Sequence, residues 1–179
     1  VAMMVYMGQF DVSLIAQTVV NGADSFPLLA LPFFILAGEI MNAGGISRRI
    51  VAVAVSLLGH LRGGLGYVAI LSTVMLASLS GSAVADAAAL AAFLVPMMIK
   101  AGYSPGRTVG LIAAGAIIAP IIPPSIPFVF FGVLAGVSIT KLFMAGIVPG
   151  LLLALALVVT WWWLMRTEAP SRLPRASLR

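Results

Sequence analysis

The chain has 179 residues, of which 62% are hydrophobic and only 8% are charged. Ordinary soluble domains carry about 25% charged residues, so this composition excludes a water-soluble surface and is typical of an α-helical protein that crosses a membrane several times. The absence of cysteine and the single histidine exclude a disulfide scaffold and a metal site of several Cys or His ligands. The net charge is +5, but four of the ten basic residues lie in 166–179. We therefore expect no nucleic-acid partner and interpret 166–179 as a basic cytoplasmic tail beside the lipid bilayer.

Two helical segments are expected in the N-terminal part of the chain. Residues 26–43 are apolar except for Glu39, and at about 1.5 Å per residue they can form a transmembrane helix across a hydrocarbon core of about 30 Å. In 46–62 the apolar side chains recur at helical spacing, while Arg49 and His60 share another face. This pattern predicts an interfacial amphipathic helix that lies along the membrane surface. Glu39 comes near the end of its segment, which favours a structural role close to the interface.

The long apolar stretch 63–99 has Asp86 as its single charged residue. One helix of this length would measure about 55 Å, whereas two full crossings would need about 40 residues and a turn. Basic residues flank both ends, which indicates that both ends lie on the cytoplasmic side. The stretch is therefore predicted to be a re-entrant helical hairpin whose tip, 78–82, stops inside the bilayer under a cover of protein or of a water-filled cavity. A tight hairpin that spans the whole bilayer remains the alternative.

The next uncharged stretch, 108–140, would form a helix of about 50 Å, which is too long for one straight crossing. It contains four prolines within eight positions. Each proline removes a backbone N–H group and disfavours α geometry in the preceding residue, so this transmembrane helix is predicted to break at 121–127. Residues 142–165 then form a transmembrane helix that ends in three tryptophans, with Arg166 as a cytoplasmic anchor. Residues 1–165 are thus interpreted as one transmembrane permease region.

Two interrupted segments in one membrane region predict a solute site near the midplane of a secondary transporter. Half-helices that end there present N–H groups to anions and carbonyl groups to Na⁺ or H⁺. The predicted ion and substrate site comprises Ser80, Gly81, Ser82, Asp86, Pro123, Pro124 and Ser125, and the candidate Na⁺ ligands among them are Ser80, Gly81, Ser82, Pro124 and Ser125. The simpler interpretation is that the serines only cap helix ends and the prolines only kink a helix.

Asp86 follows the predicted tip by one helical turn, and an acidic residue at membrane depth is expected to be functional. It can contribute to cation binding or hold the tip together through hydrogen bonds, and both roles remain open. Enzyme motifs are missing: Ser80 takes the place of the first glycine in a G-x-S-x-G motif around Ser82, and there is no G-x-x-x-x-G-K-[ST] loop. We therefore expect a transporter and no enzyme, without a cofactor and coupled to Na⁺ or H⁺.

Four runs of this sequence carry a resemblance to a known family: FPLLALPFFILAGEIMNAGGISRR, GHLRGGLGYV, SLSGSAVADAAAL and APIIPPSIPFVFFGVLAGVSI. They closely resemble the large membrane (permease) subunit, the DctM-like component, of tripartite ATP-independent periplasmic (TRAP) transporters. Ala119 stands where the last motif usually has glycine. The resemblance covers nearly the whole chain, and it places Ser80, Gly81, Ser82 and Asp86 in the first hairpin tip and Pro123, Pro124 and Ser125 in the first helix break.

This resemblance implies an all-α, polytopic membrane protein built from two inverted repeats, each with a re-entrant hairpin and a broken helix, that moves as an elevator. It implies Na⁺ coupling, a small membrane subunit, a periplasmic solute-binding protein that delivers an organic acid such as a C4-dicarboxylate or sugar acid, and a location in the bacterial inner membrane. Because family members are considerably longer, the chain is expected to be a fragment that holds the first repeat. The alternatives are another elevator-type transporter without a binding protein, and a non-transporting membrane assembly module.

Overall fold

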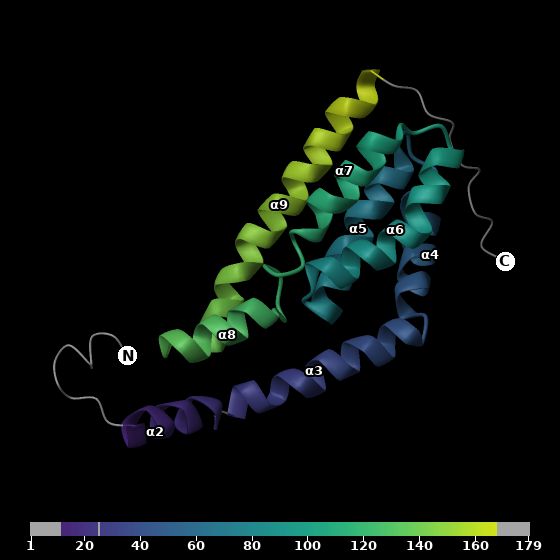
Figure 1. The fold of residues 1–179 in the computed structure, drawn as a ribbon. Coiled ribbons are helices and arrows are strands. Elements are labelled where there is room, and N and C mark those ends of the chain that lie inside the picture. Colours follow the sequence, from purple (N-terminus) through teal and green to yellow (C-terminus); the bar gives the residue numbers. More distant parts are fainter. Residues whose placement is uncertain (1–11, 25, 168–179) are drawn as a thin grey trace.

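The computed structural model describes residues 12–24 and 26–167, so most of the expected basic tail, 166–179, lies outside the described residues. Within the described part the chain is all α-helical and contains no β-strand (Figure 1). Its helices are α2 (Val12–Ala23), α3 (Phe26–Ala43), α4 (Ile46–Leu58), α5 (Gly64–Ser80), α6 (Ala83–Lys100), α7 (Pro105–Ala116), α8 (Ile126–Ala135) and α9 (Ile139–Thr167). Helices α4 to α7 form a bundle, α9 runs along one side of it, and α2 and α3 extend away below it (Figure 1).

Helices α3 and α4 are two arms of a bent pair. Residues 31–43 and 46–58 are bent by 60° relative to each other. The bend lies at Gly44 and Gly45, where Gly45 has a left-handed φ of 78° that favours glycine. Helix α4 ends at Leu58, four residues before the end of the amphipathic segment expected from the sequence. Glycines follow directly at 59, 63 and 64, and glycine is a poor helix former, so the chain turns there instead of continuing the helix.

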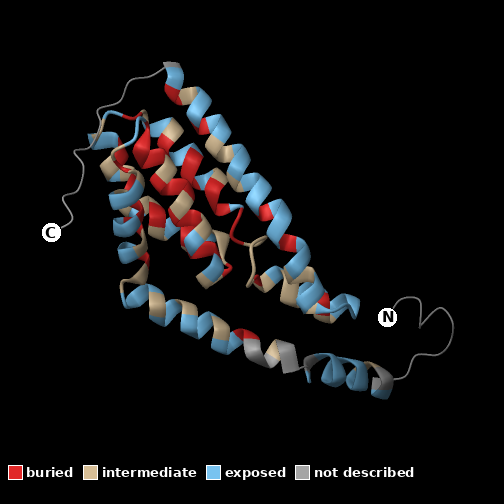
Figure 2. Cartoon of the chain, turned by 180° about the vertical axis from the view of Figure 1, so that it is seen from behind, coloured by how far each residue is buried: buried red, intermediate tan, exposed pale blue. Residues whose placement is uncertain are grey.

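Helices α5 and α6 form the hairpin, and their connection is short. Helix α5 ends at Ser80, Gly81 has a left-handed φ of 58°, and α6 begins after Ser82. The expected tip is therefore a tight turn between two helices of 17 and 18 residues. Helix α5 packs against α4, α6, α7 and α9, and most of the buried residues lie in this central bundle (Figure 2).

The broken helix consists of α7, a non-helical segment at 117–125, and α8. The break begins four residues earlier than the sequence predicts, because N–H groups at 118 and 119 bond to carbonyls three residues back instead of four. Pro127 was expected to lie in the break, but it lies in the first turn of α8. Proline is well tolerated there because the first N–H groups of a helix have no intrahelical partner.

Helix α9 has 29 residues and is longer than the expected span 142–165. Trp161 attaches α9 to the base of the hairpin, which is the end opposite to the tip. Its Nε1–H donates to the carbonyl of Gly63 at 2.9 Å, and its ring stacks on Tyr103 with centroids 5.8 Å apart. A Cβ at Gly66 would lie 1.9 Å from the Trp161 ring, so only glycine allows this approach. Trp161 therefore contacts both the start of α5 and the residues after α6, which places the two ends of the hairpin at the same end of the bundle.

The outer surface of the bundle is apolar. Helices α6 and α9 are long and apolar enough to cross a membrane, and α3 with α4 forms a third candidate if the bent pair is one span. Figure 2 shows α3 and α9 mostly exposed, and their exposed residues include Phe33, Leu152, Leu155 and Trp163. Large apolar side chains that face outward over whole helices are typical of a surface covered by lipid or by other membrane helices. The chain is an all-α membrane protein.

Candidate functional site

The hairpin tip is held together by side-chain hydrogen bonds. The hydroxyl of Ser80 donates to Oδ1 of Asp86 at 2.6 Å and accepts a hydrogen bond from the N–H group of Ser82 at 3.1 Å. Asp86 therefore ties the last residue of α5 to the first turn of α6. The hydrogen bond to Oδ1 thus fits one of the two roles considered for Asp86, that of holding the tip together.

Ser82 and Ser125 are both helix N-caps. The hydroxyl of Ser82 accepts from the N–H group of Ala85 at 3.4 Å, and that of Ser125 accepts from the N–H group of Phe128 at 3.3 Å. Ser125 also donates to the carbonyl of Pro120 at 2.6 Å, which closes the loop of the helix break on itself. Both serines therefore cap helices, as the simpler interpretation expects, and their part in ion binding stays a prediction.

The hairpin tip lies directly against the helix break. A Cβ at Gly81 would lie 2.6 Å from the carbonyl oxygen of Pro124 and 3.3 Å from Cα of Ser125. Two segments that are far apart in sequence are thus brought together by a backbone approach that only glycine permits. Pro123 precedes this contact and is joined to Pro124 by a cis peptide bond.

Helix ends of both signs meet at this contact. Helix α5 ends at the tip, while α6 and α8 begin next to it, at Ser82 and Ser125. A helix C-terminus carries a partial negative charge and a helix N-terminus a partial positive charge. The contact between tip and break therefore offers carbonyl groups that favour a cation and N–H groups that favour an anion within one small region.

The serine hydroxyls retain capacity for a cation. A hydroxyl has one O–H donor and two acceptor lone pairs. Ser80 and Ser125 each use the donor and one lone pair within the protein, so one lone pair of each oxygen remains available. The part of the chain that the structure describes contains no group of three or more His, Cys, Asp or Glu side chains that could hold a metal ion. The oxygens at the tip and the break are thus hydroxyl and carbonyl oxygens, together with the Asp86 carboxylate that is bonded to Ser80.

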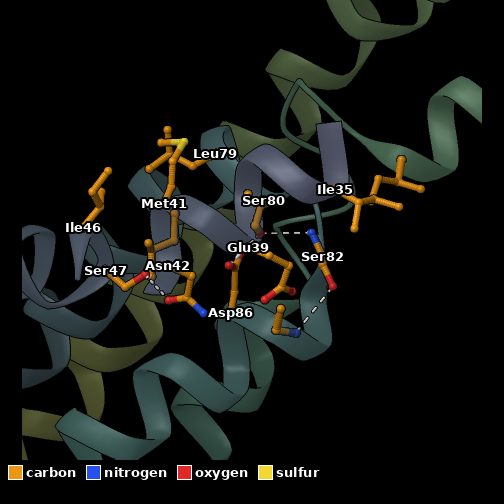
Figure 3. Close-up of a pocket in the computed structure, with 14 residues that line it drawn as sticks. Ile35, Glu39, Met41, Asn42, Ile46, Ser47, Leu79, Ser80, Ser82 and Asp86 are labelled. Carbon is orange, nitrogen blue, oxygen red and sulfur yellow. Dashed lines mark hydrogen bonds between the residues drawn. The ribbon is translucent and has the colours of Figure 1, made fainter. Parts of the chain in front are cut away.

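A cavity of about 200 Å³ lies beside the tip, between α3 and the hairpin (Figure 3). Asp86 lines it and is only 3% exposed. Its second oxygen, Oδ2, is buried and has no hydrogen-bond partner among the described residues. Ser80 and Ser82 line the same cavity, whereas Ser125 and Pro124 line a separate apolar pocket.

The cavity also includes two polar residues of α3, Glu39 and Asn42, that the sequence analysis did not place in the site (Figure 3). Asn42 accepts a hydrogen bond from the hydroxyl of Ser47 at 2.7 Å across the α3–α4 bend. Glu39 is exposed, and it follows Gly38, whose position packs against the backbone of Ser80. The sequence does show Glu39 as an acidic residue in an otherwise apolar helix. Glu39 lies far from the tip along the chain, however, so the sequence gave no reason to place it beside the tip.

Comparisons with known proteins identify the family. The family model described as "Tripartite ATP-independent periplasmic transporter, DctM component" matches residues 1–179. The chain is 64% identical to the 2,3-diketo-L-gulonate TRAP transporter large permease protein of Escherichia coli (strain K12), over 90% of this chain and 38% of that protein. It is 41% identical to the sialic acid TRAP transporter large permease protein of Vibrio cholerae, over 99% of this chain and 42% of that protein. It is 44% identical to the isethionate TRAP transporter permease protein of Oleidesulfovibrio alaskensis, over 90% of this chain and 26% of that protein.

The chain thus spans about two-fifths of the length of the large permease relatives that it matches. The match over all 179 residues includes the hairpin tip, the helix break and the helices that bring them together. These relatives are permease subunits of transporters and not enzymes. The chain belongs to the DctM family, the large membrane permease component of tripartite ATP-independent periplasmic transporters.

Proposed function

We propose that this chain forms the part of a Na⁺-coupled permease in which the first hairpin and the first broken helix bind the coupling ion and contribute to binding an organic acid. The contact of Gly81 with Pro124 and Ser125 is the observation that carries the proposal. It brings Gly81 of the tip against Pro124 and Ser125 of the break, and the hydroxyls of Ser80 and Ser125 each keep a free lone pair. A neutral shell of hydroxyl and carbonyl oxygens suits a cation that must also be released in each cycle.

The proposed substrate is an organic anion because the N-termini of α6 and α8 both lie at the contact. Exposed N–H groups and the partial positive charge of a helix start favour carboxylates and similar groups. The relatives are named for 2,3-diketo-L-gulonate, sialic acid and isethionate, which are all organic acids or their anions. The names differ among themselves, so they support a substrate class and no single compound.

The proposed setting is a tripartite system in the bacterial inner membrane. Membership of the DctM family implies a small membrane subunit and a periplasmic solute-binding protein that delivers the substrate. This family membership favours a tripartite transporter over another elevator-type transporter that lacks a binding protein. The remaining alternative, a non-transporting assembly module, rests on the short length of the chain compared with its relatives.

An uptake experiment tests the proposal. A full-length large permease that carries this sequence is reconstituted into proteoliposomes with its small subunit, and uptake of labelled organic acids is measured with and without the binding protein and a Na⁺ gradient. We expect uptake only when both are present. Uptake that is independent of Na⁺ would contradict the proposed coupling, and uptake without the binding protein would contradict the tripartite setting. Proteoliposomes that hold only this chain test the assembly-module alternative, since coupled uptake by them would exclude it.

A further inference from the structure

Two arginines at the start of α4 stand beside a second cavity, at the bend between α3 and α4. This cavity has a volume of about 410 Å³ and is lined by residues 42–45, by Ser47, Arg48 and Arg49, and by Phe93 of α6. Arg48 and Arg49 are exposed, and neither has a carboxylate partner among the described residues. The lining thus carries two positive charges and no acidic residue.

The ring of Phe93 holds one of the two guanidinium groups. Cζ of Arg48 lies 5.1 Å from the centre of this ring, which is within the range of a cation–π contact. Such a contact uses the charge of the guanidinium but none of its five N–H donors. These donors therefore remain for an anion, and arginine binds the paired oxygens of a carboxylate or similar group through parallel hydrogen bonds.

The second cavity adjoins the cavity beside the hairpin tip. Asn42 and Ser47 line both cavities, and a hydrogen bond of 2.7 Å joins their side chains across the bend (Figure 3). Ser80 and Ser82 of the tip line the first cavity. A polar wall of two residues thus connects the hairpin tip with the two arginines.

Helix α4 runs beside the hairpin with its start toward the tip. Ser47 lines the tip cavity together with Leu79, in the last turn of α5, whereas Leu58 at the other end of α4 lies against Gly64, the first residue of α5. In the predicted re-entrant arrangement the two arginines therefore lie deeper in the membrane than Arg62 at the base. Charged side chains at membrane depth face a water-filled cavity or a partner, and they mark solute pathways.

We propose that Arg48 and Arg49 form an anion-binding vestibule, which holds the carboxylate or sulfonate group of the organic acid on its way between the hairpin tip and the cytoplasm. The proposal rests on the proposed function, because the organic anion comes from there, but the vestibule is separate from the contact between tip and break. Two positive charges in a cavity raise the local concentration of an anion. Ion pairs of exposed arginines are weak, which suits a step from which the anion must leave again.

Charged thiol reagents test the vestibule without any need for transport. The chain has no cysteine, so Ala43→Cys places a single thiol in the lining of an otherwise cysteine-free full-length large permease that carries this sequence. Its reaction rates are measured with an anionic, sulfonate-bearing methanethiosulfonate and with a cationic, trimethylammonium-bearing one. We expect the ratio of the anionic to the cationic rate to fall by about tenfold or more when Arg48→Gln and Arg49→Gln are combined.

Gly106→Cys is the matched control. Gly106 is also exposed, has nothing within 4 Å of its Cβ position and does not line the cavity, so its rate ratio should not respond to the two glutamine changes. Arg48→Lys combined with Arg49→Lys keeps both charges and should keep the ratio of Ala43→Cys close to that of the parent.

Protection from labelling tests whether an organic anion occupies the vestibule. Isethionate, the anion for which one relative is named, should slow the reaction of Ala43→Cys with the anionic reagent more than chloride does at the same concentration. This protection should disappear in the double glutamine variant.

The proposal is overturned if the rate ratio is the same in the double glutamine variant as in the parent, or if isethionate protects no better than chloride. An α4 that lies along the membrane surface, as its amphipathic pattern predicts, would place both arginines among lipid phosphates. If vesicles of phosphatidylglycerol block the labelling of Ala43→Cys in the parent but not in the double glutamine variant, and phosphatidylcholine blocks neither, the arginines bind a lipid headgroup and the proposal is also overturned.

Uptake separates this proposal from the proposed function. If the glutamine changes leave the rate ratio unaltered while organic acids are taken up with Na⁺ and the binding protein, the vestibule fails and the proposed function stands. If the ratio and the protection change as expected but no organic acid is taken up, the proposed function fails while the anion site stands.

Discussion

The two carboxylate oxygens of Asp86 lie in different surroundings. Sequence reasoning considered a ligand and a brace as alternatives, because only one position and one charge were visible. In the structure Oδ1 accepts from Ser80, as the brace requires. Oδ2 is buried without a partner among the described residues, and a role as ligand stays a prediction. Ser82 and Ser125 are similar, since each caps a helix and stands where the proposed ion and substrate bind.

Gly81 provides the sharpest prediction at the residue scale. In Gly81→Ala the new Cβ would lie 2.6 Å from the carbonyl oxygen of Pro124, and alanine at a left-handed φ costs a further 1 kcal/mol or so. We expect Na⁺-driven uptake to be lost and thermal stability to fall by about 2 kcal/mol or more. Gly136→Ala is the control, because Gly136 also ends a helix at a left-handed φ of 65° but has nothing within 4 Å of its Cβ position. Equal effects of the two changes would show that the contact between tip and break is unimportant.

At the scale of elements, α9 is attached to the base of the hairpin by one buried tryptophan. Trp161 is 2% exposed and donates to Gly63, whereas Trp163, two residues later, is 68% exposed. The sequence predicts a transmembrane helix that ends in these three tryptophans. The structure adds a packing role for Trp161, because Gly66 leaves room for its ring.

Trp161→Phe should therefore destabilise the protein much more than Trp163→Phe. The first change removes the hydrogen bond to Gly63 and leaves space beside Gly66, which together should lower the free energy of unfolding by about 2 kcal/mol. The second change affects an exposed ring and should stay within about 0.5 kcal/mol. Thermal unfolding of both purified full-length variants measures the difference. If they unfold alike, Trp161 does not anchor α9.

At the scale of the whole molecule, helix α9 also shows how the two ends of the hairpin are placed. Trp161 contacts Gly63 before α5 and Tyr103 after α6, so both ends of the hairpin lie together. The basic residues that flank it, Arg62 and Arg107, indicate which side of the membrane this is. The contacts among helices do not tell a re-entrant hairpin from a full-spanning one, and the re-entrant form stays a prediction.

Cysteine labelling tests this arrangement, and the chain has no cysteine of its own. In an otherwise cysteine-free full-length permease, Arg62→Cys and Arg107→Cys should both react with a membrane-impermeant reagent from the cytoplasmic side. Lys141→Cys is the comparison, because Lys141 follows the broken helix, is exposed and is expected on the opposite side. If Arg62→Cys and Arg107→Cys label from opposite sides, the orientation of the hairpin and the cavity beside its tip must be reconsidered.

The sequence by itself determined the elements that depend on neighbours along the chain. Long apolar stretches identify the helices, Gly81 and Ser82 form the turn of the hairpin, and prolines interrupt the helix after α7. Each of these effects acts over a few residues of backbone. The exact extent of the break was not determined in this way: Pro127 is compatible with the first turn of a helix, and the local pattern does not say on which side of it the helix starts.

Only the tertiary structure decided which of these elements meet. The approach of Gly81 to Pro124, the place of Glu39 beside Asp86 and the burial of Trp161 depend on how α3, α5, α8 and α9 pack. Such contacts join residues far apart in sequence, and their energy comes from the fit and the burial of side chains between helices. Helical periodicity shows which face of a helix is apolar, but it does not show which residue of one helix lies against which residue of another. For this reason the candidate residues of the tip and the break were predictable one by one, whereas the cavity with Glu39 was not.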